Sequence, residues 1–524
     1  MTLKPLRLFI ALAVLCSVAV TANAEVYNDE LVCRAPTDKL SPTEYLRALS
    51  LDLTGNLPTS SELEAVRNEG VVPDALIEEY LASDEFADMA VRFHKALLWP
   101  NLESVRLVAR NSELRKENKT GIYYRYYAAN RYRGDRVPCR NEEEPDQTLQ
   151  TIVKLPMEDG TMREGYVWRE AYWNPGELIK VCAYDAQEME ASENGTLCQS
   201  KSGPSRDDCG CGPNLIWCVY KNEELFRDAL EHDLDHRVRE IIKGDRPYLD
   251  LLTNTSMFVN GPLVHYFRYI GEANGSFPII PFAVSKLALP DLDYHDINTY
   301  IPVALPNYHS GVLTSPAFLL RFQTDRSRAN QFWTKFICEP FQPPPGGLPE
   351  ADDAEALDPD LQSRSGCKFC HAILEPGAAY WGRWPESSVG YLGQQDYPGY
   401  DPECAKCAVE GGCSNVCKER YIVNAVATKE KAYYGWLKSY LFIHQDHMAN
   451  VEEGPSLLVK RMAQDERLPN CMAQRAVQWL WGRNIAEGEE DVLNDFALGF
   501  MMDGYSFKSL IKAVVTSDTY RRVR

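Results

Sequence analysis

The spacing of apolar residues predicts helices near both ends of the chain. Capping boxes at Ser41 and Thr59 each precede an amphipathic run, and they predict helices that end at Gly55 and near Gly70. Apolar residues recur at helical spacing in several later stretches. The further helices expected cover 74–98 with a break at Ser83, 223–242, 316–338, 421–443, 468–482, 490–502 and a last segment from a Ser506 cap onward.

The pattern changes in the middle of the chain. Residues 120–220 are rich in tyrosine and contain short strand-like runs such as 165–184, separated by Gly and Pro. Residues 340–366 combine prolines with many acidic residues, which is typical of a linker. The 524 residues are enough for several packed units, so we expect a mainly α, multidomain fold.

The changes of pattern also suggest segment boundaries. The expected segments are a signal peptide (1–24), an N-terminal helical domain (25–119), an aromatic and Cys-rich insertion (120–220), a second helical domain (221–339), the linker (340–366), a segment with a C-x-x-C-H motif and a Cys cluster (367–420), and a C-terminal helical module (421–524).

Composition and charge limit the classes of partner. The chain is 45% hydrophobic and 25% charged, which is ordinary for a globular protein and excludes disorder and collagen-like repeats. Its net charge of −20, without any block of Lys and Arg, makes nucleic acids and anionic membranes poor partners. Apolar stretches long enough to span a membrane are absent beyond the extreme N-terminus, so no transmembrane segment is expected after signal cleavage.

The N-terminus predicts export. A positively charged start is followed by the apolar run 8–20 and by Ala22-Asn23-Ala24, which has small residues where signal peptidase requires them. We expect cleavage after Ala24 and a mature protein in the periplasm, on the cell surface or secreted. A lipoprotein anchored through Cys16 is the alternative, but Leu15 occupies a position where a small residue is needed.

An oxidising compartment favours disulfide bonds among the cysteines. We expect pairing within two clusters, which consist of Cys182, Cys198, Cys209, Cys211 and Cys218, and of Cys404, Cys407, Cys413 and Cys417. Four thiolates of the second cluster could instead hold zinc or an iron–sulfur cluster. The other cysteines are scattered at 33, 139, 338 and 471. Without Cys16 and the C-x-x-C-H pair, 13 cysteines remain, and this odd number implies one that is free, ligand-bound or paired between chains.

Cys367, Cys370 and His371 form a C-x-x-C-H motif, the attachment sequence of c-type haem. The two thiols add to the haem vinyl groups, and the adjacent histidine supplies the proximal iron ligand. Export agrees with this interpretation, because c-type haem is attached outside the cytoplasm. The alternatives are a small disulfide loop or half of a zinc site with an incidental histidine.

Several blocks in order along the chain carry a family resemblance. They are Leu49–Gly55 with Leu57–Thr59, Leu81–Phe86, Phe258–Leu263, Gly311–Thr314, Cys338–Pro340, the motif at 367–371, Cys471–Arg483 and Asp503–Tyr520. This order resembles the secreted planctomycete-type cytochrome c proteins built from several domains of unknown function. The resemblance implies an extracytoplasmic haem protein in electron transfer, with a redox partner in the cell envelope, and it identifies no reaction.

The sixth iron ligand is left open by the sequence. Met or His there gives a closed electron-transfer site, and an empty position permits peroxide or oxygen chemistry. The candidates are His444, His447 and Met448, with His309 as a further possibility. Four aromatic residues after the motif either cover the porphyrin or belong to an ordinary core; they are Tyr380, Trp381, Trp384 and Tyr391.

Other catalytic motifs, such as a nucleophile elbow, a zinc-protease helix or a phosphate loop, are absent from the sequence. His232 and His236 lie four residues apart on an expected helix, but without a third ligand they are better explained as part of a solvated acidic face. The sequence therefore predicts one covalent haem c and electron transfer. A haem peroxidase with an open distal site is one alternative. A disulfide-stapled surface protein that binds a ligand such as a glycan is another.

Overall fold

The computed structural model describes residues 39–144, 152–200, 202–271, 285–341, 347, 357–386 and 389–522. This part of the chain is mainly helical, as predicted, and three small sheets accompany the helices. None of the described helices combines the length and the hydrophobicity that crossing a membrane requires. The predicted signal peptide, Cys16, Cys33 and the prolines at 343–345 and 349 lie outside the described residues.

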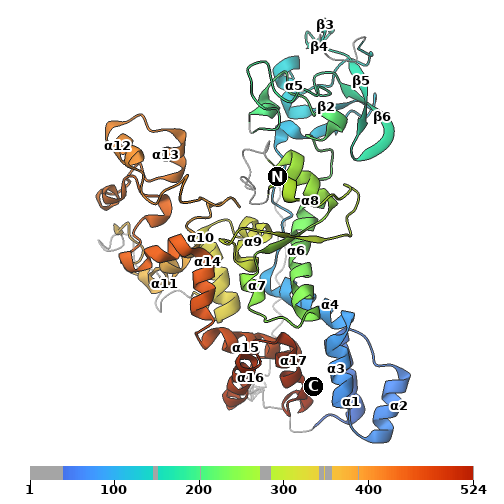
Figure 1. Cartoon of the computed structure of the whole chain (residues 1–524), viewed down its shortest axis with the longest axis vertical. Coiled ribbons are helices and arrows are strands. Elements are labelled where there is room, and N and C mark those ends of the chain that lie inside the picture. Colours follow the sequence, from blue (N-terminus) through green and yellow to red (C-terminus); the bar gives the residue numbers. More distant parts are fainter. Residues whose placement is uncertain are drawn as a thin grey trace, which may run out of the picture.

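The molecule is elongated, and the N-terminal helices lie near its lower end (Figure 1). They are α1 (Pro42–Thr54), α2 (Ser60–Glu69), α3 (Asp74–Ala82) and α4 (Asp84–Leu98). The capping boxes at Ser41 and Thr59 are both formed, and α1 and α2 end at Gly55 and Gly70 in the left-handed conformation. Ser83 separates α3 from α4. The local signals in this region are confirmed.

The C-terminal helices pack against this N-terminal group. They are α15 (Arg467–Trp481), α16 (Glu490–Met502) and α17 (Phe507–Thr516), and all three match the predicted ranges. The Tyr45 hydroxyl donates to the Val515 carbonyl at 2.9 Å, and the Leu40 N–H donates to the Arg521 carbonyl at 2.8 Å. One hydrophobic core extends from α1 through the centre of the molecule to α17.

The central helices surround one long helix, α6. The elements are α6 (Glu223–Lys243), α7 (Asp250–Thr253), α8 (Gly261–His265), α9 (Pro316–Arg321) and α10 (Asp325–Phe332), with π-helical turns at Tyr266–Ile270 and Trp333–Ile337 and a hairpin of β7 (Ser256–Val259) and β8 (Ile301–Ala304). The single helix expected over 316–338 is wrong. Thr324 caps a new helix, and the buried Arg328 guanidinium binds the Phe322 carbonyl that the break leaves without a helical partner, Nε to O 2.9 Å.

The aromatic, Cys-rich insertion forms the upper end of the molecule (Figure 1). Its elements are β1 (Leu114–Lys116), β2 (Tyr123–Arg125), α5 (Tyr126–Arg133), the short pair β3 (Leu155–Pro156) and β4 (Met162–Arg163), and β5 (Tyr166–Ala171) and β6 (Asn174–Cys182). The main sheet has the order β1-β2-β6-β5. Its β5–β6 hairpin confirms the strand-like run predicted at 165–184.

A buried ionic cluster holds this insertion together. Asp185 accepts from Arg125 Nε at 2.8 Å and from Arg133 Nη2 at 3.0 Å, and Arg133 also binds Glu164 at 2.5 Å. Burial by itself raises the pKa of Asp185, but the guanidinium groups of Arg133 and Arg125 outweigh it and hold this pKa below its usual value. Removing one partner would leave an uncompensated charge in the interior, which is strongly destabilising.

Six disulfides connect the described cysteines outside the C-x-x-C-H motif. They join Cys139 to Cys182, Cys198 to Cys209, Cys211 to Cys218, Cys338 to Cys471, Cys404 to Cys417 and Cys407 to Cys413. The prediction that Cys404, Cys407, Cys413 and Cys417 pair among themselves is confirmed. Of the 13 cysteines counted above, only Cys33 lies outside the described residues.

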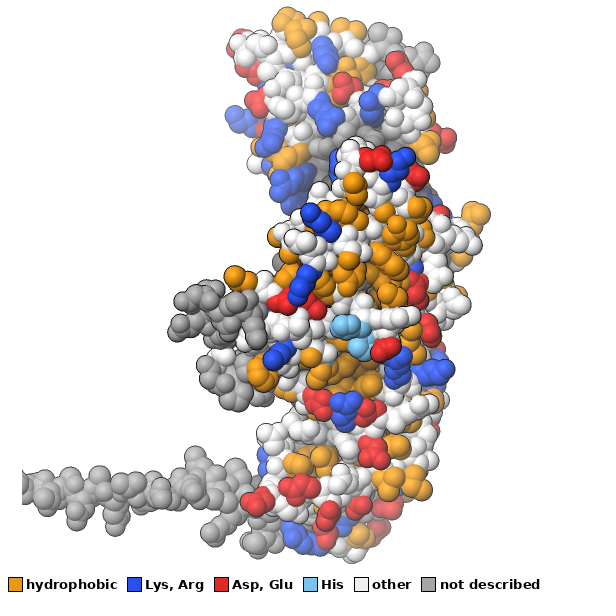
Figure 2. All heavy atoms as spheres, turned by 90° about the vertical axis from the view of Figure 1, so that its left-hand side faces the viewer, with side chains coloured by type: hydrophobic (Ala, Val, Ile, Leu, Met, Phe, Trp, Pro, Cys, Tyr) orange, Lys and Arg blue, Asp and Glu red, His pale blue; other side chains and the backbone are white. Residues whose placement is uncertain are grey.

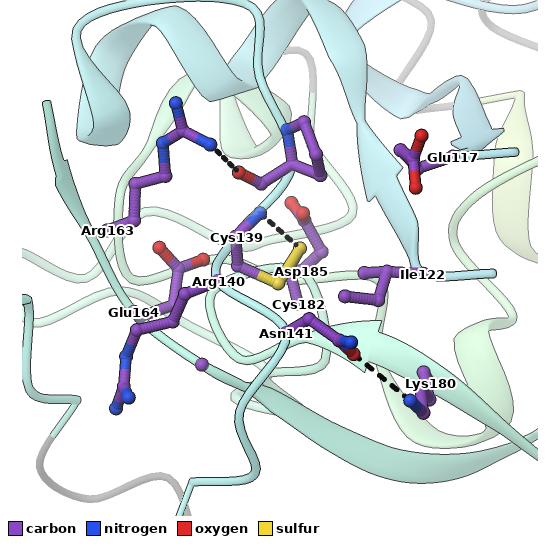
Figure 3. The surroundings of a disulfide bond; sticks show 12 residues. Glu117, Ile122, Cys139, Arg140, Asn141, Arg163, Glu164, Lys180, Cys182 and Asp185 are labelled. Carbon is purple, nitrogen blue, oxygen red and sulfur yellow. Dashed lines mark hydrogen bonds between the residues drawn. A yellow bond between two sulfur atoms is a disulfide. The ribbon is translucent and has the colours of Figure 1, made fainter. Parts of the chain in front are cut away.

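The prediction for Cys182 is wrong, since its partner Cys139 lies outside its sequence cluster. Figure 3 shows why the two meet: Cys139 lies beside the end of β6, and its backbone N–H donates to Cys182 Sγ at 3.0 Å. Neighbouring contacts, such as that of Lys180 Nζ with Asn141 Oδ1 at 3.1 Å, hold the same alignment. Sequence proximity therefore predicts pairing only where no sheet brings a distant residue closer.

The segment after the motif folds as a separate lobe with α12 and α13 (Figure 1). From the motif onward the elements are α11 (Lys368–Ala378), a 3₁₀ turn at Ala379–Trp381, α12 (Pro402–Glu410), α13 (Asn415–Arg420), 3₁₀ turns at Thr428–Tyr433, Lys438–Tyr440 and Gln445–His447, and α14 (Met448–Met462). Of these, α11 and α14 also pack on the main core. The lobe has its own apolar cluster, which includes the disulfide-linked Cys404 and Cys417.

The helix expected over 421–443 is wrong. Tyr421 pairs with Leu437 as an isolated β-bridge, so the run folds back across the disulfide lobe. Gly435 makes this possible with a φ of 83°, and a Cβ there would come within 2.5 Å of the Ala405 side chain. The apolar periodicity of this run reflects packing onto the lobe and not a helical face.

Three buried histidines make stability depend on pH. Burial lowers the pKa of His94 and His309 to about 4 and that of His265 to about 3, so all three are neutral in the folded protein. In the unfolded chain these histidines become protonated below about pH 6.5. The free energy of unfolding therefore has its maximum value above that pH and falls as the pH approaches 4. We expect a loss of about 3 kcal/mol per histidine over this range.

Urea unfolding at a series of pH values measures this slope. In a His94→Gln variant the slope should decrease by about one proton, which is about 1.4 kcal/mol per pH unit. A wild-type free energy of unfolding that stays constant between pH 6.5 and 4.5 would contradict the assignment of these histidines as neutral.

Candidate haem-attachment site

The C-x-x-C-H motif forms the first turn of α11. Cys367 is the N-cap residue, and the His371 backbone N–H donates to the Cys367 carbonyl at 3.0 Å. Residues three and four positions apart lie on the same side of a helix, so both sulfur atoms and the imidazole extend from one face. All three side chains are partly exposed. Neither cysteine belongs to the six disulfides, so the small disulfide loop considered for the motif does not form.

Glu375 orients the His371 ring. Its carboxylate accepts from Nδ1 of His371 at 2.5 Å and from Nε of Arg326, on α10, at 2.6 Å. A carboxylate partner fixes the tautomer that carries its proton on Nδ1 and leaves Nε2 with the lone pair that binds a metal. A histidine with such a second partner is the usual form of an iron or zinc ligand.

The same helix carries exposed apolar side chains. Phe369 is 60% exposed and Ile373, one turn later, is 51% exposed, and Leu357 before the helix is 69% exposed. Figure 2 views the side of the molecule that carries α11 to α14, and hydrophobic side chains gather in the middle of that face beside histidine. Phe369 and Ile373 lie one turn apart on α11, so together they offer an apolar surface that a ligand or partner could cover.

A cavity of about 300 Å³ lies beside α11. Its walls come from the approach to the motif, from α10 and α11, and from the segment before α14; they include Asp325, Arg326, Asp360, Gln362, Glu375, Ala378, Glu386, Glu430 and Phe442. Gln362 Nε2 donates to the Phe442 carbonyl at 2.8 Å. The chain just before His444 therefore lies against the chain just before Cys367.

The cavity contains a carboxyl group with an altered pKa. Burial raises the pKa of Asp325 to about 7, and Arg328 opposes this shift while Glu386 adds to it. The Asp325 carboxylate accepts from Arg328 Nη1 at 2.8 Å. The wall of the cavity thus contains a carboxyl group whose pKa lies above its usual value.

The candidates for a sixth ligand have different surroundings. His444 is exposed, whereas Met448 packs against the apolar cluster of the disulfide lobe. His447 is half-buried, and its Nδ1 is shielded from solvent with no hydrogen-bond partner among the described residues. Asn450 Nδ2 donates to the Pro376 carbonyl at 2.9 Å, which fixes the start of α14 against α11.

His309 and the aromatic residues after the motif belong to the core. His309 packs on Trp384 with ring centroids 4.8 Å apart, and burial, aided by Arg237, lowers its pKa to about 4. Trp381 is fully buried and its Nε1 donates to the Leu313 carbonyl at 2.9 Å. Tyr380 is also buried, and Tyr391 stacks on Tyr308 at 3.9 Å. Of the two explanations for these aromatic residues, core packing is the one that the structure supports.

The other metal candidates do not form sites in the described residues. The Cys404 cluster consists of two disulfides, which leaves no thiolates for zinc. His236 stacks on Tyr300 at 4.1 Å, and its neighbour Asp233 is buried in a contact with Arg237. The one cluster of donor atoms tight enough for an ion in this part of the chain includes Cys139 and Cys182, whose sulfurs are joined to each other.

The sequence analysis missed Glu375 and Arg326. Glu375 follows His371 by four residues, and the helical i, i+4 rule identifies it once α11 is assigned. Arg326 reaches the site from α10 and has no signal in the local sequence.

Comparison with known proteins adds no assignment: no family model matches the chain, and no curated protein or solved structure is significantly similar to it.

Proposed function

We propose that this chain is an exported c-type haem protein that transfers electrons through one covalently attached haem. Cys367 and Cys370 would hold the haem, and His371 would be the proximal iron ligand. The observation that carries the proposal is the first turn of α11, where the motif presents two cysteines and a histidine whose Nδ1 is already bound by Glu375.

The surroundings of the motif suit a large apolar group. Phe369 and Ile373 are exposed on the same helix, and burial under a porphyrin would remove them from water. Haem c, when bound, supplies an iron that changes between the ferric and ferrous states. The two cysteines would supply the thioether sulfurs.

The chain's own residues hold the ligand in place. Glu375 is shared between His371 and Arg326, so the imidazole cannot rotate without breaking its bond to a carboxylate that Arg326 of α10 holds in place. The carboxylate also makes His371 a stronger donor, which stabilises the more highly charged ferric state.

We propose His447 as the leading sixth ligand, with Met448 and His444 as the other candidates. The Nδ1 of His447 is buried without a described partner, which is an unfavourable state that a metal bond would relieve. A filled sixth position favours electron transfer over reaction with peroxide.

The six disulfides support export, because such bonds persist in oxidising compartments. The redox partner would then be a protein of the cell envelope. The partner would dock near α11, where an edge of the haem would be exposed, because electron transfer needs a short path to the haem.

Covalent attachment is tested with a Cys367→Ala/Cys370→Ala variant produced in a host that matures c-type cytochromes. The wild-type chain should retain haem through denaturing electrophoresis, because thioether bonds survive it, and the variant should lose all of this haem stain. Lys368→Ala, inside the motif but exposed, is the matched control and should retain haem fully. Equal haem retention by the double variant would contradict the assignment.

Replacing Glu375 by Gln tests the orienting role of this residue. A neutral amide donates less electron density through His371, so the midpoint potential should rise while covalent haem retention stays unchanged. Glu453→Gln, on α14, changes the same charge without contacting His371 and should leave the potential unaltered. An unchanged potential in Glu375→Gln would show that Glu375 does not bind the iron ligand.

The sixth ligand is tested by the ferric spectra of His447→Ala, Met448→Ala and His444→Ala. The wild-type protein should be low-spin, and His447→Ala alone should become high-spin. Conversion in one of the other variants would move the ligand to that residue. A wild-type protein that is already high-spin and reacts rapidly with hydrogen peroxide would favour the peroxidase alternative.

A further inference from the structure

The insertion joins the helical body near the start of α6, away from α11 (Figure 1). A large groove lies at this junction. Its volume is about 870 Å³, within the usual range for ligand sites. It is formed by β1, the chain at 219–221, the start of α6 and residues 106–108. The charged residues in its wall are Arg106, Glu113, Arg115, Lys116, Lys221, Glu223, Glu224 and Arg227.

The groove has a surplus of positive charge although the chain as a whole is acidic. Glu113 is paired with Arg106, and Glu223 lies 3.8 Å from Arg227 while it accepts the Val108 N–H at 3.1 Å. The remaining cations are Arg115, Lys116 and Lys221, which are exposed and form no ion pair with any described residue. These three side chains remain able to bind an anion.

Each of these cations lies over a tyrosine ring. The Arg115 guanidinium is 3.7 Å from the ring centre of Tyr126, Lys116 Nζ is 5.4 Å from that of Tyr123, and Lys221 Nζ is 5.3 Å from that of Tyr220. Cation–aromatic contacts hold such side chains in place and keep their charge. Tyr220 itself lines the groove and offers an aromatic surface for a ring-shaped ligand.

The groove walls are fixed before any ligand arrives. The Leu114 N–H donates to the Val219 carbonyl at 2.8 Å, and the Val219 N–H donates to the Ser112 carbonyl at 2.9 Å. The disulfide of Cys211 with Cys218 ends one residue before this pairing. A site that is already ordered loses less entropy on binding.

We infer that this groove binds an anionic polysaccharide, with sulfate or uronic carboxylate groups on the cations and a sugar ring on Tyr220. The carboxylates of the wall, Glu224 above all, accept hydrogen bonds from sugar hydroxyls, which a mixed-charge groove needs and a purely basic one lacks. Nucleic acid fits less well, because the chain has no block of Lys and Arg along which a phosphate backbone could run. The site is independent of the proposed haem.

The test measures binding of the mature full-length protein to three probes by calorimetry: a heparin oligosaccharide, an oligogalacturonate and a neutral dextran oligosaccharide. The acidic probes should bind and dextran should not. The variant Arg115→Glu/Lys116→Glu/Lys221→Glu should weaken acidic binding at least about 100-fold, and Tyr220→Ala about tenfold. Preference between the two acidic probes distinguishes sulfate from carboxylate recognition.

A triple control reverses the same number of charges elsewhere. Arg67→Glu/Lys406→Glu/Lys460→Glu changes three exposed cations outside the groove and should bind the acidic probes like wild type. Circular dichroism shows whether each variant is folded. The inference would be overturned if both triple variants lost the same affinity or if neither acidic probe bound. It would also be overturned if a single-stranded DNA oligonucleotide bound more tightly than both glycans.

Discussion

The site depends on the unequal burial of a single helix. The C-terminal half of α11 is fixed in the core: Gly377 lies so close to Trp333 that a Cβ would come within 3.2 Å of its ring, and the Pro376 carbonyl accepts from Asn450. The first turn of the same helix, with Cys367 and His371, stays partly exposed. A helix is stiff, so the buried half determines where the exposed half places Cys367 and His371.

Disulfide bonds connect distant segments of the elongated molecule. The Cys338–Cys471 disulfide joins the turn after α10 to α15 across 133 residues, and two short-range disulfides close the lobe that follows α11. A disulfide that closes a long loop stabilises the fold more than one that closes a short loop, because it removes more conformational entropy from the unfolded chain. The end of α10, the helix that packs on α11, is therefore tied to α15 by a bond that lasts in an oxidising compartment.

The sequence predicted those features that depend on neighbouring residues. Capping boxes at Ser41 and Thr59 and the break at Ser83 were found because their hydrogen bonds span only three residues. Features set by distant contacts were missed. The run at 421–443 has helical periodicity, but its Trp436 and Leu437 bridge to Tyr400 and Tyr421. Cys139, the partner of Cys182, reaches the end of β6 only through the fold of the insertion. The candidate site shows the same difference between local and distant contacts. The motif predicted His371, but the contact of Arg326 with Glu375 comes from another helix and was not predicted.

The central claim is that one haem is bound covalently at the C-x-x-C-H turn. Intact-mass spectrometry of the exported chain, produced with a c-type maturation system and analysed without reduction, tests it most directly. The account predicts a single species that carries the mass of one haem, with the added mass on the tryptic peptide that contains Cys367. A chain without this increment, in which a disulfide or bound zinc occupies Cys367 and Cys370 instead, would contradict it.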